Sequence, residues 1–367
     1  MSFRILIIVG ENGFPLSGSD QMALNITRQL AAQSDFQITL GHTNKQVLLT
    51  DSKPSAIERL EIDHWSTDLK LSQIRRSFDL VHLIDISDPR HVLLAMNLSR
   101  LQNIPLIITP ATDYSLWREK DQAIAASKQA SHIFALTQTE SSLFQSWGVS
   151  PHKITVIPPA INSGECKEKS FRKEREIQEY VPIVLFLGRK LQTKGYELIL
   201  ESAKYVWDFL PETLFIFIGP DSTCSIDIFN KYQLDKRIIN LGMVDENTKI
   251  AALQACDVLC MPSVADVFPL VFLEAWSFGK PVIASEMTSI RDIVQDEKDG
   301  IIVKHSSVAV AEGVLRLLTN PTLRKTMGAE GLRRVKQMHS SEEIGKQISE
   351  VHRRVLLGNS SGEGGKR

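Results

Sequence analysis

Two carboxylates stand eight positions apart in the segment Asp266-Val-Phe-Pro-Leu-Val-Phe-Leu-Glu274. Pro269 favours the first turn of a helix and Gly279 its end, so we expect a helix over Pro269–Phe278. The start of such a helix leaves backbone N–H groups unpaired, which favours an anion in front of it. A buried Glu274 would need partners, such as the paired hydroxyls of a ribose, and Asp266 could accept hydrogen bonds from a second set of hydroxyls. The alternative is that Asp266 caps the loop and Glu274 is solvated.

Arg189 and Lys194 bring two positive charges to the segment Gly188-Arg-Lys-Leu-Gln-Thr-Lys-Gly195, directly after the apolar run Ile183–Leu187. Open α/β sheets bind ligands at the carboxyl ends of their parallel strands. Gly188 allows a sharp turn at this point. The guanidinium of Arg189 and the ammonium of Lys194 both suit a diphosphate. The alternative is a pair of solvated cations on an exposed loop.

A third loop, Gly10-Glu-Asn-Gly-Phe-Pro-Leu-Ser-Gly-Ser-Asp20, follows the first predicted strand and precedes a helix. Gly13 and Gly18 allow close approach of its backbone to a ligand. The loop is not Gly-x-Gly-x-x-Gly and contains no Walker lysine, so a nicotinamide, flavin or P-loop nucleotide site is not indicated. A plain strand-to-helix connection is the alternative.

Short apolar runs alternate with longer amphipathic ones along the chain. This rhythm predicts an α/β fold of two Rossmann-like domains, each with a parallel sheet covered on both faces. The predicted strands of the first half are Ile5–Val9, Phe36–Leu40, Leu80–Ile84, Leu106–Thr109, His132–Leu136 and Lys153–Ile157. Those of the second half are Ile183–Leu187, Leu214–Ile218, Ile238–Leu241, Val258–Met261, Val282–Ala284 and Ile301–Val303. Predicted helices include Gln21–Gln33, Tyr196–Trp207, Pro321–Gln337 and Glu342–Leu357.

The charged segment 164–180 interrupts this rhythm and is poor in apolar residues. It predicts a crossing between the two domains. We therefore expect an N-terminal domain over 1–163, a linker over 164–180 and a C-terminal domain over 181–340. A C-terminal helix follows over 341–357, and the Gly/Ser-rich tail 358–367 predicts disorder.

The composition argues against several classes of function. The formal net charge is −1, so the broad basic surface needed for nucleic acid is not indicated. The four cysteines form no Cys-x-x-Cys pair, and we expect buried thiols rather than a metal site. The first apolar run is too short for a signal peptide or a spanning helix. We expect a cytoplasmic protein, with peripheral contact to the inner membrane left open.

Taken together, these segments resemble the retaining, two-domain glycosyltransferases of family 4, which have the GT-B fold. The resemblance covers nearly the whole chain. The hallmark pair of carboxylates lies at Asp266 and Glu274, and Leu187–Gly195 resembles the family's phosphate loop. Pro158–Asn162 resembles its domain junction, and Asp257–Ser263 resembles a strand that ends in Pro-Ser. The resemblance implies two domains facing a central cleft, with a C-terminal helix that crosses back to the N-terminal domain.

The resemblance also implies roles. Glu274 would bind the nucleotide ribose, Asp266 would hold hydroxyls of the donor sugar, and Arg189 and Lys194 would stabilise the leaving diphosphate. Arg189, Lys194 and Asp266 would thus be the catalytic residues. The remaining donor-binding residues would be Gly18, Gly188, Met243, Val244, Phe268, Pro269 and Leu270. No Asp-x-Asp pair occurs in the chain, so the implied transfer needs no metal and no resident cofactor.

Some positions depart from the family pattern. The first carboxylate is Asp266 where Glu is usual, which shortens its reach by one methylene and could retune the preference for the donor sugar. Thr112 stands where a histidine near the reacting centre is common. His82, Asp85, Thr112 and Asp113 are the candidate residues on the acceptor side. The alternative for His82 is a structural histidine bonded to neighbouring backbone.

The function indicated is transfer of a hexosyl group from a UDP- or GDP-sugar to an acceptor, with retention of configuration. The acceptor could be a polysaccharide, a lipid-linked sugar or a small metabolite, and the oligomeric state is open. The alternative is a catalytically weak glycosyltransferase-like subunit that binds nucleotide sugar or a partner. A sugar-nucleotide epimerase with the same fold is disfavoured by the combination of the two carboxylates with Arg189 and Lys194.

Overall fold

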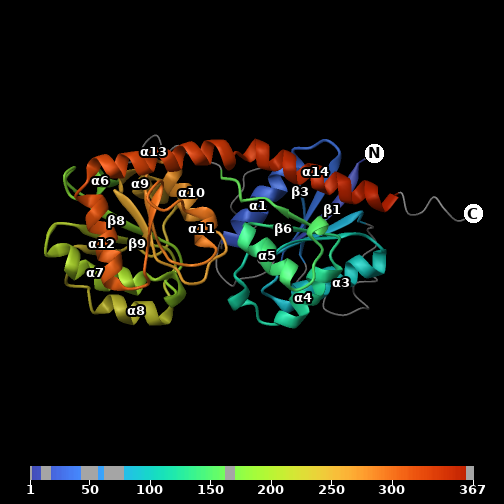
Figure 1. Ribbon diagram of the computed structural model, residues 1–367, viewed down its shortest axis with the longest axis horizontal. Helices are drawn as coiled ribbons and strands as arrows, with labels where there is room; N and C mark the ends of the chain where they lie inside the picture. Colours follow the sequence, from blue (N-terminus) through green and yellow to red (C-terminus); the bar gives the residue numbers. More distant parts are fainter. Residues whose placement is uncertain (1, 10–17, 43–56, 62–77, 162–169, 361–367) are drawn as a thin grey trace, which may run out of the picture. The chain divides into compact units, whose positions relative to one another are not determined.

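The computed structural model describes residues 2–9, 18–42, 57–61, 78–161 and 170–360. The chain divides into two compact units. The first comprises Met1–Ala160 together with Ser340–Arg367, and the second comprises Ile161–His339. Both are α/β units (Figure 1).

A parallel sheet of seven described strands forms the centre of the first unit, in the order β3-β2-β1-β4-β5-β6-β7. Its strands are largely continuous apolar runs, as expected for a parallel sheet buried on both faces. They are β1 (Phe3–Val9), β2 (Phe36–His42), β3 (Ile57–Glu61), β4 (Leu80–Ile84), β5 (Leu106–Thr109), β6 (His132–Ala135) and β7 (Ile154–Val156). The order reverses between β1 and β4, which makes that point of the carboxyl edge the switch point.

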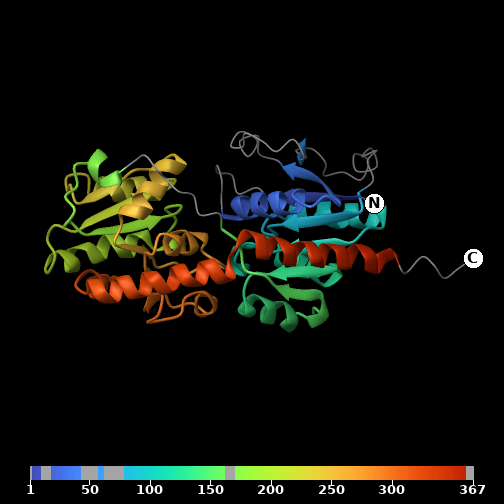
Figure 2. The same cartoon turned by 90° about the horizontal axis from the view of Figure 1, so that it is seen from above.

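Helices cover both faces of this sheet. They are α1 (Gly18–Ala31), α3 (Pro89–Gln102), α4 (Lys120–Gln129), α5 (Gln138–Ser146) and α14 (Ser341–Ser360), with short 3-10 turns at Tyr114–Leu116 and Pro151–Lys153. Val81 and Leu83 of β4 belong to the core cluster that includes α3 and α4 residues. On the other face α14 packs against α1, and Figure 2 shows these two helices side by side.

The second unit is built on a parallel sheet of six described strands, in the order β10-β9-β8-β11-β12-β13. They are β8 (Ile183–Leu187), β9 (Leu214–Ile218), β10 (Ile238–Asn240), β11 (Val258–Met261), β12 (Val282–Ser285) and β13 (Gly300–Val303). Here the order reverses between β8 and β11, so the loops after these two strands meet at the switch point.

The helices of the second unit follow the βα rhythm. They are α6 (Phe171–Glu174), α7 (Tyr196–Trp207), α8 (Thr223–Asn230), α9 (Glu246–Ala255), α10 (Leu270–Ser277), α11 (Ile290–Ile293), α12 (Ser307–Leu318) and α13 (Pro321–Met338), with a 3-10 turn at Gln192–Lys194. Helix α12 packs on α7 and on the sheet, while α10 packs on α13 and β12.

The structure differs from the sequence-based expectation at β3, in the predicted linker and at the end of the C-terminal helix. Strand β3 was not predicted. The described part of the predicted linker contains α6, whose Phe171 and Arg172 are buried, and Arg172 donates to the Ala255 carbonyl, so this part belongs to the second unit. Helix α14 continues to Ser360, beyond the predicted end, and the rest of the predicted tail lies outside the described residues. As the fold prediction had it, this C-terminal helix belongs to the first unit.

Candidate functional site

The loops that follow β8 and β11 bring Lys194 and Asp266 together. The Lys194 ammonium donates a hydrogen bond to Asp266 Oδ2. Both side chains are mostly buried, at 17% and 14% exposed. The Ser289 hydroxyl donates to the Asp266 carbonyl at 2.9 Å and anchors the backbone of the same loop. A cation and a carboxylate from two different loops therefore lie at the switch point of the second sheet.

Gly195 permits this approach. Its φ is +74°, and a Cβ at this position would lie 2.3 Å from the Pro262 carbonyl oxygen. Only glycine tolerates both conditions. The Val264 N–H also donates to the Thr193 carbonyl at 2.9 Å, so backbone contacts hold the two loops together independently of the ion pair.

Glu274 has a cationic partner that the sequence analysis missed. Lys249 Nζ lies 2.8 Å from Glu274 Oε1 and 2.9 Å from Glu246 Oε1. Burial lowers the pKa of Lys249, but the two carboxylates outweigh that effect and the pKa is raised overall. One feature of the sequence could have indicated this role. Lys249 lies near the N-terminus of α9, where the helix dipole disfavours a cation unless it has an anionic partner.

The start of α10 lies one residue later than predicted. Leu270 is its first residue, and Pro269 is the N-cap with an extended ψ of 101°. Phe268 and Pro269 are buried, while Leu270 is partly exposed. The N-terminal end of this helix therefore lies directly after the Asp266 loop.

The other donor-side residues also follow strand ends of the second sheet. Gly188 and Arg189 are partly exposed after β8, and Val244 is partly exposed after β10. Met243 is 60% exposed. Lys190, also in the loop after β8, is a second residue that the sequence analysis missed, and it is fully buried.

Asp85 and Thr112, two candidates on the acceptor side, contact each other at the carboxyl edge of the first sheet. The Thr112 hydroxyl donates to Asp85 Oδ1 at 3.0 Å, and the Ser87 N–H donates to the same oxygen at 2.9 Å. Asp85 is fully buried and has a φ of 71°, and Ala111 has a φ of 61°. Positive φ at two non-glycine residues indicates backbone strain at this edge, which is common at functional sites.

His82, another candidate on the acceptor side, is not at the end of its strand. It lies within β4 and is fully buried. Its Nε2 is hydrogen-bonded to Thr109 Oγ1 at 2.8 Å, and its ring packs 5.1 Å from that of His352 on α14. Because side chains alternate along a strand, His82 points into the face covered by α14. Burial, with the neighbouring His352 and His132, lowers its pKa well below the usual value.

Asp113 and Gly18 each occupy the start of a helical segment. Asp113 is the N-cap of the 3-10 turn Tyr114–Leu116 and accepts from the Ser115 N–H at 2.9 Å. Gly18 is the first residue of α1, with open space around its Cα where a side chain would project. The preceding part of the predicted glycine loop, including Gly13, lies outside the described residues.

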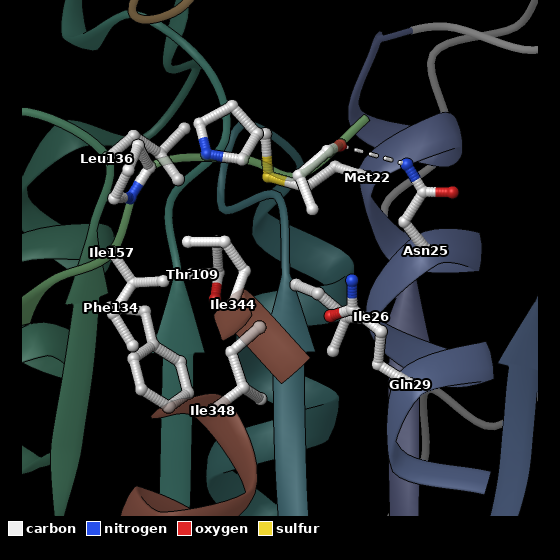
Figure 3. Close-up of a pocket in the computed structure, with 13 residues that line it drawn as sticks. Met22, Asn25, Ile26, Gln29, Thr109, Phe134, Leu136, Ile157, Ile344 and Ile348 are labelled. Atoms are coloured by element: carbon white, nitrogen blue, oxygen red, sulfur yellow. Dashed lines mark hydrogen bonds between the residues drawn. The ribbon is translucent and has the colours of Figure 1, made fainter. Parts of the chain in front are cut away.

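A small cavity lies in the first unit between α1, α14 and the ends of β5 and β6 (Figure 3). Met22, Ile26, Phe134 and Ile348 line it with mainly apolar atoms, and Asn25 donates to the Ala160 carbonyl at 3.3 Å at its rim. Its volume of about 20 Å³ accommodates about one water molecule. A volume of this size is too small for a sugar ring.

Two further features bear on function. Within the described ranges, no three His, Cys, Asp or Glu side chains form a group that could hold a metal ion. Among the helices whose residues are described, none has the length and apolar character needed to cross a membrane.

Two family models match the chain. The model "Glycosyl transferases group 1" matches residues 167–334, and "Glycosyltransferase Family 4" matches residues 17–165. A Klebsiella pneumoniae protein described as an uncharacterized 41.2 kDa protein in the cps region is 30% identical over 261 residues, which cover 67% of this chain and 70% of that protein. The chain belongs to glycosyltransferase family 4.

This family 4 glycosyltransferase is also similar to the Escherichia coli UDP-Gal:alpha-D-GlcNAc-diphosphoundecaprenol alpha-1,3-galactosyltransferase. The identity is 26% over 259 residues, which is 64% of this chain and 64% of the relative's length. The match therefore spans less than two thirds of that enzyme. Among solved structures, Anabaena Alr3699/HepE in complex with UDP and glucose has a TM-score of 0.76 at 18% identity, covering 94% of this chain and 98% of that one. That likeness concerns the fold, which is GT-B.

Proposed function

We propose that this chain transfers a hexosyl group from a UDP- or GDP-sugar to an acceptor hydroxyl, with retention of anomeric configuration. The observation that carries the proposal is the pair of carboxylates eight positions apart, each bonded to a lysine from another element. Asp266 is bonded to Lys194, and Glu274 to Lys249. Asp266 precedes the start of α10, an end that favours an anion, and Glu274 lies within the same helix.

In the proposed reaction the carboxylates bind hydroxyl groups of the donor, and the cations bind its diphosphate. The carboxylate of Glu274 would accept hydrogen bonds from the ribose hydroxyls, and Asp266 would accept them from the donor sugar. Lys194 has three donor hydrogens, so it can keep Asp266 and still contact a phosphate. The acceptor hydroxyl oxygen would bond to the anomeric carbon as the bond between that carbon and the phosphate oxygen breaks. The electron pair of the broken bond moves to the diphosphate, which can also take up the hydroxyl proton. Lys194 and Arg189 would stabilise that charge, which is the step that electrostatic catalysis accelerates.

The comparisons support a choice of donor and acceptor for the first assays. The name of the Escherichia coli relative specifies a UDP-sugar donor and a lipid diphosphate acceptor, and the Anabaena structure contains UDP and glucose. UDP-hexoses and a lipid-linked sugar are therefore the first substrates to test, followed by GDP-hexoses, polysaccharide and small metabolites.

Glu274→Gln and Glu246→Gln form a matched pair that tests the donor site. Both carboxylates bond Lys249, but the Glu246 side chain is 70% exposed and the Glu274 side chain 20%. We expect Glu274→Gln to lower kcat/KM for the donor by about 100-fold, because an interaction with the bound nucleotide is lost. Glu246→Gln should stay within about threefold of wild type, since exposed ion pairs contribute little. Release of UDP or GDP measures both, and equal activity in the two variants would refute the assignment.

A weakly catalytic subunit is the second candidate, and Thr112 motivates it. The Thr112 hydroxyl donates to Asp85, and threonine cannot supply the charge of the histidine that is common at this position. A donor-hydrolysis assay separates the two candidates. If the protein binds a nucleotide sugar but releases neither UDP nor GDP with any acceptor, the subunit hypothesis replaces the enzyme.

A further inference from the structure

Lys190 holds a fully buried ammonium in the loop after β8. Its Nζ donates to the Gly219 carbonyl and lies 3.3 Å from Asp221 Oδ1. It also lies 5.8 Å from the centre of the Phe229 ring. Desolvation of a charge costs several kcal/mol unless partners compensate for it. The buried ammonium therefore carries a desolvation cost that an apolar side chain of the same length would avoid.

The partners of Lys190 belong to the loop after β9, which the backbone also holds close. The Lys190 N–H donates to the Pro220 carbonyl at 3.0 Å, and the Ser222 hydroxyl donates to the Lys190 carbonyl at 2.9 Å. Gly219 has a φ of +129°, and a Cβ there would lie 2.1 Å from the Gly188 carbonyl oxygen. The two loops thus touch through backbone, and the ammonium links them through a side chain.

The same network continues to the loop after β10. Asn240 donates to Asp221 Oδ1 at 3.1 Å, and the Asn240 side-chain oxygen accepts from the Gly242 N–H at 3.2 Å. The Gly219 N–H donates to the Gly242 carbonyl at 2.8 Å. Strands β8, β9 and β10 are neighbours in the sheet, so one chain of hydrogen bonds connects all three loops at its carboxyl edge.

We propose that Lys190 is a positioning residue that couples the phosphate side of the donor site to its nucleoside side. The link from Lys190 through Asp221 and Asn240 fixes the loop carrying Arg189 and Lys194 relative to Gly242–Val244. The resemblance to family 4 implies that this segment, with the donor-binding residues Met243 and Val244, would border the base. Lys190 touches no substrate in this role. Loops that are already held in place lose less conformational freedom when a ligand binds. The diphosphate and the nucleoside therefore each increase the affinity for the other when both belong to one ligand. The inference rests on the proposed function, because it assumes a nucleoside diphosphate in this site.

Calorimetry on the full chain tests the coupling with UDP, GDP and their nucleosides as probes. Lys190→Met keeps the length of the side chain and removes the ammonium. We expect it to weaken binding of the preferred nucleoside diphosphate by about 10-fold, within the usual range of coupling between sites. Binding of the free nucleoside should change by less than threefold. Lys231→Met, an exposed lysine of the same unit, is the matched control and should bind both ligands as wild type does.

The outcomes are distinguishable. If wild type binds neither UDP nor GDP, the proposed function and this inference both fail. If wild type binds one of them and folded Lys190→Met binds it within twofold, the inference alone is overturned. An equal loss for nucleoside and nucleoside diphosphate also overturns it, because that pattern indicates general damage to the site.

A second variant covers failure of Lys190→Met to fold. Asn240 is exposed, and Asn240→Ala breaks the link to Gly242 without placing an unpaired charge in the core. We expect Asn240→Ala to reduce the affinity gain of the diphosphate over the nucleoside by about threefold to 10-fold. An unchanged gain in this variant contradicts the coupling.

Discussion

At the scale of the residue, Lys194 has two roles in the proposed reaction. It neutralises Asp266, and it would stabilise the charge that develops on the departing diphosphate. We expect Lys194→Met to lower kcat by about 100-fold to 1000-fold, as loss of one preorganised donor to a developing charge usually does. Asp266→Glu, which restores the usual family residue, should change the rate by less than about 10-fold and alter the order of preferred donor sugars.

Nucleotide release with a panel of UDP- and GDP-hexoses measures both variants. Lys231→Met serves again as the control for removal of a lysine from the same unit. A Lys194→Met enzyme that turns over at the wild-type rate would show that this ammonium does not stabilise the leaving group.

The sequence predicted some of these residues and not others, for a physical reason. Asp266 and Glu274 lie eight positions apart, and their helix carries its own start and stop signals. Lys249, which bonds Glu274, and Lys190, which bonds Asp221, have roles that depend on contacts between elements distant in the chain. A lone lysine on a helix or loop is ordinarily solvated, so spacing alone could not single them out.

At the scale of the element, α14 forms one side of a buried histidine cluster in the first unit. His352 on α14 packs near His82, and its Nδ1 donates to the Ile348 carbonyl at 2.8 Å. Burial lowers the pKa of His352 to about 4, against the opposing effect of that hydrogen bond. Burial and the nearby Arg354 lower the pKa of His132 to about 4. These histidines therefore stay neutral in the folded unit at pH 7.

The stability of this unit should fall as it is acidified. Because the folded pKa values lie below that of the unfolded chain, about 6.5, the unfolded state binds more protons between these values. Each of His132 and His352 should then cost roughly 2 kcal/mol of unfolding free energy between pH 7 and pH 5. Glu140 acts in the opposite direction, because burial raises its pKa to about 8 and the folded state holds its proton.

A comparison of variants isolates the histidine contribution, since Glu140 is common to all of them. We expect His352→Phe to reduce the loss of stability between pH 7 and pH 5, whereas His152→Gln at an exposed site should leave it unchanged. Urea unfolding at both pH values measures the difference. Equal pH dependence in wild type and His352→Phe would mean that His352 is not held neutral by burial.

Buried elements were the most predictable part of the fold. Strands such as Leu80–Ile84 and Val258–Met261 match their predicted bounds, because continuous apolar runs of that length suit a sheet covered on both faces. Strand β3, Ile57–Glu61, escaped prediction because three of its five residues are charged and it lies at the edge of its sheet. Its pairing with β2 holds it in the sheet, although its charged composition does not favour a strand.

At the scale of the whole molecule, the chain leaves the first unit at Ala160 and returns to it at Ser340. The returning helix α14 is bonded there, since Arg353 Nε donates to Asp35 Oδ2 at 2.7 Å. The second unit is continuous in sequence and carries every donor-side residue that we assign except Gly18. We therefore propose, as the central claim, that the donor nucleotide binds at the carboxyl edge of the second sheet.

Hydrogen exchange of the full chain, measured with and without UDP or GDP, tests this claim most directly. Bound nucleotide should slow exchange in segments 188–195, 242–246 and 266–277, because ligand contacts and loop ordering suppress local opening. Segment 307–318, which is helix α12 and contains none of the assigned donor-side residues, should exchange at the same rate in both conditions. Protection confined to the first unit, or absent from these three segments while calorimetry shows binding, would contradict the account.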